Sequence, residues 1–150
     1  MNDSDRVVDT PTASTPADDP LALSLLRGAQ LIEERLAPAL AELGVSTEQW
    51  RVLAVLAGGE GRTMTDLSRL TVQAPATATR TVDKLISLAM VYRRVDPLDR
   101  RRVMVFLSPH GAQAITSVRE RERDIETDIA RSLGSRRFLA LTDGLTHLTR

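Results

Sequence analysis

The chain is 150 residues long, 42% hydrophobic and only 3% aromatic, and its formal net charge at pH 7 is zero. This length suits one domain with or without a tail, and a core of Leu, Val, Ile and Ala fits a mostly helical fold better than a β-sandwich. The absence of cysteine excludes disulfides, thiolate zinc sites and thiol-based peroxide sensing.

The first segment, residues 1–18, is rich in Asp, Ser, Thr and Pro, which predicts a disordered tail. No apolar run in the sequence approaches the roughly 20 residues of a membrane-spanning helix, and the N-terminus lacks the apolar region of a signal peptide. We therefore expect a cytoplasmic protein with no membrane partner.

Two segments, residues 19–45 and 112–150, are expected to form one helical dimerisation domain. In the first segment, Asp19 and Pro20 are typical of an N-cap followed by proline at the first helical position, and apolar residues recur every three or four. Pro38 should kink or divide this helix.

A second long helix is predicted from Pro109 to Leu133, and a last helix begins after Gly134 and carries the apolar stripe Phe138, Leu141, Leu145 and Leu148. These terminal helices have little to pack on within one small domain. Their apolar faces are most simply buried against the same helices of a second chain, so we expect a homodimer.

Two capping boxes lie between the terminal segments. Ser46 with Gln49, and Thr63 with Asp66, place two polar side chains three residues apart, so that each can bond to the other's free backbone N–H. The first box predicts a helix over about residues 47–57, and the second predicts a short helix followed by a turn.

A longer helix starting at Pro75 follows that turn. Its apolar residues at positions 78, 82, 85, 86 and 89 share one stripe, and its other face is small, hydroxylic and basic. That face suits the base edges of a major groove, and Lys84, a turn later, suits a phosphate. The candidate DNA-binding residues of this recognition helix are Ala76, Thr77, Thr79, Arg80, Thr81 and Lys84.

Residues 91–95 and 102–107 are β-branched, aromatic and aliphatic, and the link between them carries Asp and Pro turn chemistry, which together predict a hairpin. Arg100, Arg101 and Arg102 lie at or near its tip, where guanidinium groups can reach a minor groove. The expected fold is mainly α with a small β-hairpin wing. It comprises a winged helix-turn-helix over residues 46–111 and the helical dimerisation domain.

Charge is distributed unevenly along the chain. Between Glu60 and Gly111, nine basic residues stand against five acidic ones, a net of +4, whereas residues 1–19 hold five Asp against one Arg, a net of −4. The basic excess is therefore local to the segment that we expect to bind double-stranded DNA.

Residues 50–53, 78–85 and 96–102, followed by 107–111, resemble the MarR family of bacterial winged helix-turn-helix regulators. The likeness covers about residues 20–150. It implies a homodimer that represses transcription at a pseudo-palindromic operator. A small ligand, for which an aromatic compound is one candidate, then changes the spacing of the two DNA-binding segments, residues 46–111 of each chain, which we call the readers. In the family pattern, Asp99 braces Arg101.

Two features depart from that family. The turn at residues 72–76 is one residue longer than the commonest form, which leaves open which residue makes the first base contact. The missing cysteine excludes the thiol-oxidation mechanism of some members.

Some residues also have a purely structural interpretation. The wing arginines can form a solvated cluster, Asp99 can be only a turn residue, and Arg80 can pair with Asp83 on the helix surface. Trp50 suits the core near the junction of the reader and the dimerisation helices, and the lining of a ligand pocket is its alternative role.

The sequence offers little for catalysis. His110 and His147 stand apart without a compact set of ligands, and no Gly-rich phosphate loop or nucleophile with a base partner is visible, so we expect no metal, no cofactor and no enzyme activity. The alternative function is a helical protein-interaction module that uses a winged fold without specific DNA binding. The basic wing argues against it, because protein-binding surfaces favour apolar anchors.

Overall fold

The computed structural model describes residues 20–149 and confirms a mainly helical fold with a small antiparallel sheet. Its elements, in chain order, are α1 (Leu21–Glu42), α2 (Thr47–Leu56), β1 (Arg62–Thr63), α3 (Met64–Leu70), α4 (Pro75–Ser87), β2 (Val91–Val95), β3 (Val103–Leu107), α5 (Pro109–Leu133) and α6 (Ser135–Leu148). The predicted tail over residues 1–18 and the predicted cap at Asp19 lie outside the described residues.

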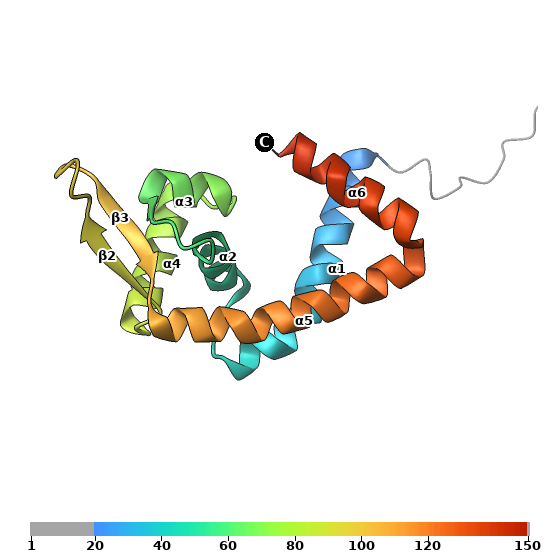
Figure 1. The fold of residues 1–150 in the computed structure, drawn as a ribbon, viewed down its shortest axis with the longest axis horizontal. Helices are drawn as coiled ribbons and strands as arrows, with labels where there is room; N and C mark the ends of the chain where they lie inside the picture. Colours follow the sequence, from blue (N-terminus) through green and yellow to red (C-terminus); the bar gives the residue numbers. More distant parts are fainter. Residues whose placement is uncertain (1–19, 150) are drawn as a thin grey trace, which may run out of the picture.

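The elements form two arms joined by α5 (Figure 1). One arm holds α2, α3, α4 and the hairpin of β2 and β3, and the other holds α6 and the first part of α1. Helix α5 contacts α1, α2, β3 and α6, so it links both arms. None of the helices within residues 20–149 is long and apolar enough to cross a membrane.

One continuous core sits where the arms meet. Each contributing element presents aliphatic side chains at helical or alternating spacing, and their burial drives the packing. The core includes Leu36 and Leu40 of α1, Leu53 and Leu56 of α2, Leu67 of α3, Val82 and Leu85 of α4, Val105 of β3, and Ile115, Val118 and Ile125 of α5. The second half of α1 is thus anchored, whereas its first half is not.

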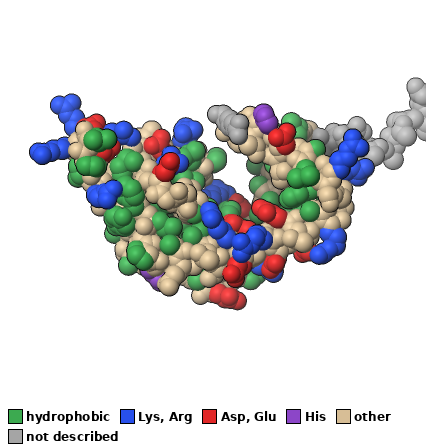
Figure 2. Space-filling view, viewed as in Figure 1, with side chains coloured by type: hydrophobic (Ala, Val, Ile, Leu, Met, Phe, Trp, Pro, Cys, Tyr) green, Lys and Arg blue, Asp and Glu red, His purple; other side chains and the backbone are tan. Residues whose placement is uncertain are grey.

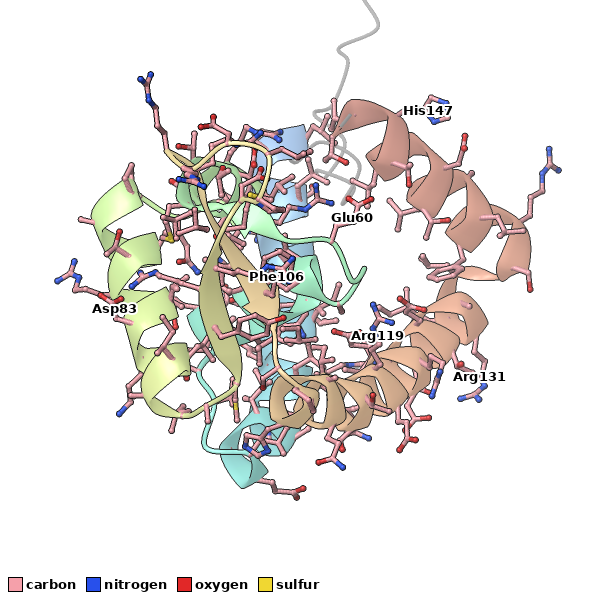
Figure 3. The ribbon with its side chains drawn as sticks, turned by 60° about the vertical axis from the view of Figure 1, so that its left-hand side comes forward. Glu60, Asp83, Phe106, Arg119, Arg131 and His147 are labelled. Carbon is pink, nitrogen blue, oxygen red and sulfur yellow. The ribbon has the colours of Figure 1, made fainter. Side chains whose placement is uncertain are left out.

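The sheet has the strand order β1-β3-β2, with both pairs antiparallel. Tyr92 pairs with Phe106 across β2 and β3, and their rings stack with centroids 5.6 Å apart. Phe106 lies on the hairpin face that is turned forward in Figure 3. A Cβ added at Gly61 would collide with the Phe106 ring, so close approach of β1 to this ring requires glycine.

Several predicted boundaries are confirmed and others are wrong. Both capping boxes form, and α5 has the predicted ends. Pro38 does not divide α1, which continues through it, and Pro20 stands at the N-cap rather than at the first helical position. The stripe of α4 does not extend to Ala89, because the helix ends at Ser87 and Ala89 is exposed with a φ of +53°.

The terminal helices keep their apolar faces open. Helix α6 has no buried residue, and large hydrophobic side chains of α1 and α6 are exposed, among them Leu21, Leu26, Leu31, Leu139, Leu141, Leu145 and Leu148. Contiguous exposed apolar surface of this kind is typical of a protein–protein interface. The assignment of residues 19–45 and 112–150 to a dimerisation domain remains a prediction.

Gly111 provides a test of how α5 docks on the reader. A Cβ at this position would fall against the backbone carbonyl oxygen of Met90, which also accepts a hydrogen bond of 3.0 Å from the Ser108 N–H. Because backbone must shift to make room, we expect Gly111→Ala to lower the unfolding free energy by about 1 to 3 kcal/mol in urea titrations. Gly58→Ala is the control, since its Cβ would meet open space. An equal effect of both substitutions would contradict this packing.

Candidate nucleic-acid interface

The turn between α3 and α4 is held by a compact set of hydrogen bonds. The Ser68 hydroxyl donates to the Gln73 carbonyl at 2.7 Å, and the Gln73 backbone N–H donates to the Ser68 carbonyl at 3.0 Å. The Gln73 side-chain amide donates to the Glu48 carbonyl at 2.9 Å, which ties the turn to α2. The start of α4 therefore has a fixed position relative to the rest of the reader.

Val72, at the outer end of this turn, has a φ of +54° and is 85% exposed. A β-branched residue rarely adopts this left-handed conformation, so the turn stores strain. The sequence predicts a long turn here, but the residue with the positive φ is known only from the structure.

Helix α3 begins with the predicted capping box. The Asp66 N–H donates to the Thr63 hydroxyl oxygen at 3.1 Å, and the Thr63 hydroxyl donates to the Asp66 carboxylate at 2.7 Å. The side-chain hydrogen bond from Thr63 stabilises the carboxylate and lowers the pKa of Asp66 below its ordinary value of 3.8.

Most of the candidate residues on α4 are accessible. Ala76, Thr79, Arg80 and Lys84 are exposed, and Thr77 is half-buried. Thr81 is only 8% exposed and lies beside the buried Val82, so it has the least accessible surface of the six predicted residues. Its contact with DNA stays a prediction.

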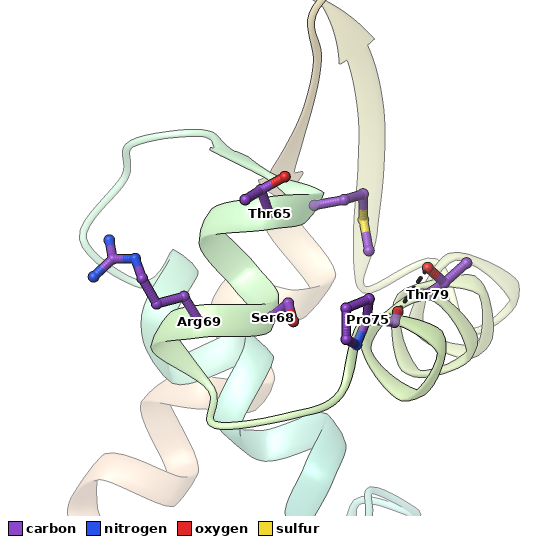
Figure 4. Close-up of a pocket in the computed structure, with 6 residues that line it drawn as sticks. Thr65, Ser68, Arg69, Pro75 and Thr79 are labelled. Carbon is purple, nitrogen blue, oxygen red and sulfur yellow. Dashed lines mark hydrogen bonds between the residues drawn. The ribbon is translucent and has the colours of Figure 1, made fainter.

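Two of the exposed side chains bond to their own helix, leaving the rest of the surface open. The Thr79 hydroxyl donates to the Pro75 carbonyl at 3.0 Å, and the Arg80 Nε donates to the Ala76 carbonyl at 3.3 Å. A hollow of about 300 Å³ between α3 and α4 is lined by Thr65, Ser68 and Arg69 of α3 and by Pro75 and Thr79 of α4 (Figure 4).

The wing turn uses its two aspartates to hold the backbone. The Leu98 N–H donates to the Asp96 carboxylate at 2.9 Å, and the Arg101 N–H donates to the Asp99 carboxylate at 3.0 Å. Asp99 therefore bonds to the backbone of Arg101, and no ion pair within 4.0 Å joins their side chains among the described residues. The turn leaves Arg100, Arg101 and Arg102 exposed at the tip.

An ion pair that the sequence analysis missed joins the recognition helix to the wing. The Arg93 guanidinium of β2 lies 2.8 Å from the Asp83 carboxylate of α4. The sequence allows Asp83 to pair with Arg80, but in the structure the Asp83 carboxylate pairs with Arg93. Only the three-dimensional packing of β2 on α4 brings these two residues together.

The basic side chains of the reader fall into two groups, those with an acidic partner and those without one. Arg62, Arg69 and Arg93 lie within 4.0 Å of Glu60, Asp66 and Asp83, while Asp96 and Asp99 accept from backbone N–H groups. Within residues 20–149, the basic side chains left without an acidic partner in the reader are Arg80, Lys84, Arg94, Arg100, Arg101 and Arg102. Arg94 instead lies over the Phe106 ring, 4.5 Å from its centroid.

Figure 2 shows several of these cations gathered at the tip of the hairpin, at the upper left. Unpaired cations on a helix and on a neighbouring hairpin form a surface of one sign, which attracts a polyanion. The other acidic and basic residues of the chain mostly lie on α5 and α1, where they alternate or pair.

Trp50 lies at the junction of the two arms and is half-buried, and its Nε1 donates to the Glu122 carboxylate of α5 at 2.7 Å. Its ring lines a cavity of about 620 Å³ between α1, α2 and the α3–α4 turn. Trp50 therefore packs against the core and also lines a cavity.

The histidines lie away from this junction. His110 is exposed at the start of α5, and His147 is exposed on α6, where its Nδ1 lies 2.9 Å from the Asp143 carbonyl (Figure 3). No group of three His, Cys, Asp or Glu residues within the described part of the chain is placed to hold a metal ion.

The second capping box, formed by Thr63 and Asp66, gives a prediction about pH. Thr63→Ala should lower the unfolding free energy by about 1 kcal/mol at pH 7, because it removes the acceptor for the Asp66 N–H. Since the folded pKa of Asp66 is lowered, its stabilising effect is complete above the unfolded pKa of about 3.8 and is lost as the pH falls through the folded value.

Urea titrations at several pH values between 7 and 2 would show this. The penalty of Asp66→Asn should shrink as the solution is acidified, whereas Thr65→Ala, on the exposed face of the same helix, should have little effect at any pH. A penalty for Asp66→Asn that stayed constant down to pH 2 would argue against the bonded carboxylate.

Comparison with known proteins agrees with this geometry. A sequence model described as the MarR family matches residues 43–102, which span α2 to the wing. A search among curated proteins found no match to the sequence.

Solved structures share the fold of most of the chain. The structure of NadR in complex with 4-hydroxyphenylacetate superposes with a TM-score of 0.80 at 23% identity, covering 94% of this chain and 99% of NadR. The repressor CouR bound to a 23-mer DNA duplex gives 0.76 at 20%, covering 94% and 100%. Wild-type MarR from E. coli gives 0.73 at 22%, covering 87% and 97%. At these identities the structural likeness establishes the winged helix-turn-helix fold.

Proposed function

We propose that this chain is a MarR-family regulator, namely a homodimeric, sequence-specific DNA-binding repressor in the cytoplasm that a small ligand releases from its operator. The family is one of transcriptional regulators and not of enzymes. The observation that carries the proposal is the sorting of charge in the reader. Every described carboxylate there has a hydrogen-bond or ion-pair partner, while the cations of α4 and of the wing tip are not paired with any carboxylate.

In this proposal, α4 lies in a major groove and the wing reaches the adjacent minor groove. Ala76, Thr77, Thr79 and Arg80 meet base edges, and Lys84 meets a phosphate. Arg100, Arg101 and Arg102 contact the minor groove or its phosphates, with the turn held by Asp99. The Asp83–Arg93 ion pair sets the position of the wing relative to α4, and so keeps both contacts in register.

The proposed dimer supplies the second reader. The apolar groove between the start of α1 and α6 is lined by Leu21, Leu25, Leu141, Leu145 and Leu148, and it is open within residues 20–149. A two-fold dimer formed by these helices would place its recognition helices in successive major grooves. The operator is then a pseudo-palindrome whose half-sites lie roughly 10 bp apart.

The cavity beside Trp50 is the proposed ligand site. It contacts α1, which is part of the proposed dimerisation domain, and it also contacts Val72 and Thr71 of the turn that positions α4. A ligand that fits only one spacing of these elements would shift the population of dimers away from the DNA-binding arrangement. Release of the operator follows from that shift.

The dimer is tested by mass. Multi-angle light scattering at micromolar concentration should give twice the 16.5 kDa of one chain. Leu145→Asp should yield monomers, because it places a charge in the apolar groove. Thr142→Asp, which is also on an exposed position of α6 but does not line the groove, should remain dimeric. A monomeric wild-type protein would remove the two-reader mechanism.

The recognition helix is tested by base preference. Arg80→Ala should weaken binding to the operator by about 1 to 3 kcal/mol and relax the preference at one position of each half-site, if the guanidinium makes a bidentate base contact. Arg121→Ala on α5, whose guanidinium lies near Asp124, is the matched control and should leave the preference unchanged. Selection from a randomised duplex library would measure both, and an unaltered preference for Arg80→Ala would place Arg80 off the bases.

The wing is tested by salt dependence. Arg100→Ala and Arg101→Ala should weaken binding to specific and scrambled duplexes alike, and should reduce the slope of log affinity against log salt by roughly one unit per lost phosphate contact. Asp99→Ala should also weaken binding, although it removes a negative charge, because the turn loses the bond to the Arg101 N–H. Tighter binding by Asp99→Ala would refute this role, and unchanged slopes for both arginine variants would remove the wing from the DNA.

A further inference from the structure

The cavity beside Trp50 is an apolar space with a single internal ion pair. Leu26, Ala29, Ile32, Ala54, Val55 and Val72 form most of its wall. Its volume of about 620 Å³ lies within the range of small-molecule sites. Within residues 20–149, the charged residues in its lining are Glu33 of α1 and Arg51 of α2.

Glu33 and Arg51 neutralise each other. The Arg51 guanidinium donates to the Glu33 carboxylate across the gap between the two helices, and the side chains are only 34% and 32% exposed. The pair therefore adds no net charge to the cavity. It also bridges α1 and α2 at the edge of the site, so a ligand must settle beside it.

Trp50 restricts the ligand in a second way. Its indole N–H is already engaged by the Glu122 carboxylate, so the ring can offer a ligand only its face or edge. Contact with that ring favours a flat, apolar or aromatic body. The polar group of the ligand must then be satisfied near Glu33 and Arg51.

A charged polar group on the ligand, whether negative or positive, would bind unfavourably beside this ion pair. A carboxylate could bond to Arg51 only by sharing it with Glu33, which would bring two negative charges together in a partly desolvated site. An ammonium group would meet the same difficulty with Arg51. An uncharged amide or hydroxyl group can donate to Glu33 or accept from Arg51 without separating the pair.

We propose that this site takes an uncharged aromatic amphiphile, and that the Arg51–Glu33 pair is the element that rejects organic anions and cations. This assignment rests on the proposed function of the cavity as the regulatory ligand site, and it specifies the chemical class of the ligand. The preference for uncharged ligands thus arises because Arg51 and Glu33 neutralise each other.

Trp50 is the only tryptophan in the chain, so its fluorescence reports on the surroundings of this one ring. These include the proposed site and a smaller hollow beside Glu122 and Ile125 of α5, and the charge variants at Glu33 and Arg51 distinguish the two. The probes are biphenyl-4-ylacetamide, biphenyl-4-ylacetate and the corresponding amine, which share one aromatic body and differ in charge. With wild-type dimer, the acetamide should bind about tenfold more tightly than the acetate or the amine.

Charge variants test the cause. Glu33→Gln leaves Arg51 unpaired, so the acetate should gain about tenfold in affinity while the acetamide changes little. Arg51→Gln should favour the amine in the same way. Glu34→Gln is the matched control, because Glu34 is an adjacent carboxylate that accepts from Gln30 and does not line the cavity. It should leave the order of the three compounds unchanged.

Three results would overturn the proposal. Wild-type protein could prefer the acetate, Glu33→Gln could leave the ratio of acetate to acetamide unchanged, or none of the compounds could alter Trp50 emission. In the last case, a change of emission on dilution of the dimer to monomers would identify the second copy as the occupant of the cavity. Operator affinity of the ligand-free samples is measured in parallel, so that a failure of the DNA-binding proposal is seen separately from a failure of this selectivity.

Discussion

The structure depends on the one-sided burial of α5. Near its start, Ala114, Ile115 and Val118 are inserted into the core of the reader, and Ile125 continues the contact toward α1. Beyond that point the helix is mostly exposed and carries α6. Because a helix is stiff over this length, a small rotation at the Ile115 end displaces α6 and the first half of α1 by a larger distance. The polar links from Trp50 to Glu122 and from Arg51 to Glu33 lie beside this pivot.

Local signals were sufficient to predict the helices and the hairpin. Hydroxyl caps at Ser46 and Thr63, proline at the first position of α4 and α5, and Asp in the wing turn each act within a few residues, so a sequence displays them directly. The sequence did not predict β1, because two residues without alternation become a strand only when β3 lies beside them. It also could not separate Thr81 from its neighbours, since a hydroxyl residue at the edge of an apolar stripe can face either side.

The candidate site depends on ion pairs that the amino-acid sequence alone does not assign. A count of charges gave the reader a basic excess, but it could not say which cations were free. The structure assigns Arg93 to Asp83 and Arg62 to Glu60, and these pairs are set by the position of β2 on α4 and by the bend before β1. The same is true of Arg51 and Glu33, which lie 18 positions apart. Such pairs convert a neutral chain into one with a neutral cavity and a positive binding face.

The composition of the exposed face of α4 has a practical consequence for chemistry. All but one of the 20 basic residues in the chain are arginine, and the exception is Lys84. Apart from the amino terminus, an amine-reactive reagent thus has a single side chain to modify, and that side chain is exposed on the recognition helix. Any acylating agent, label or crosslinker of this class becomes a site-directed probe of α4 without a substitution. The rate of its reaction would follow how closely another molecule covers that helix.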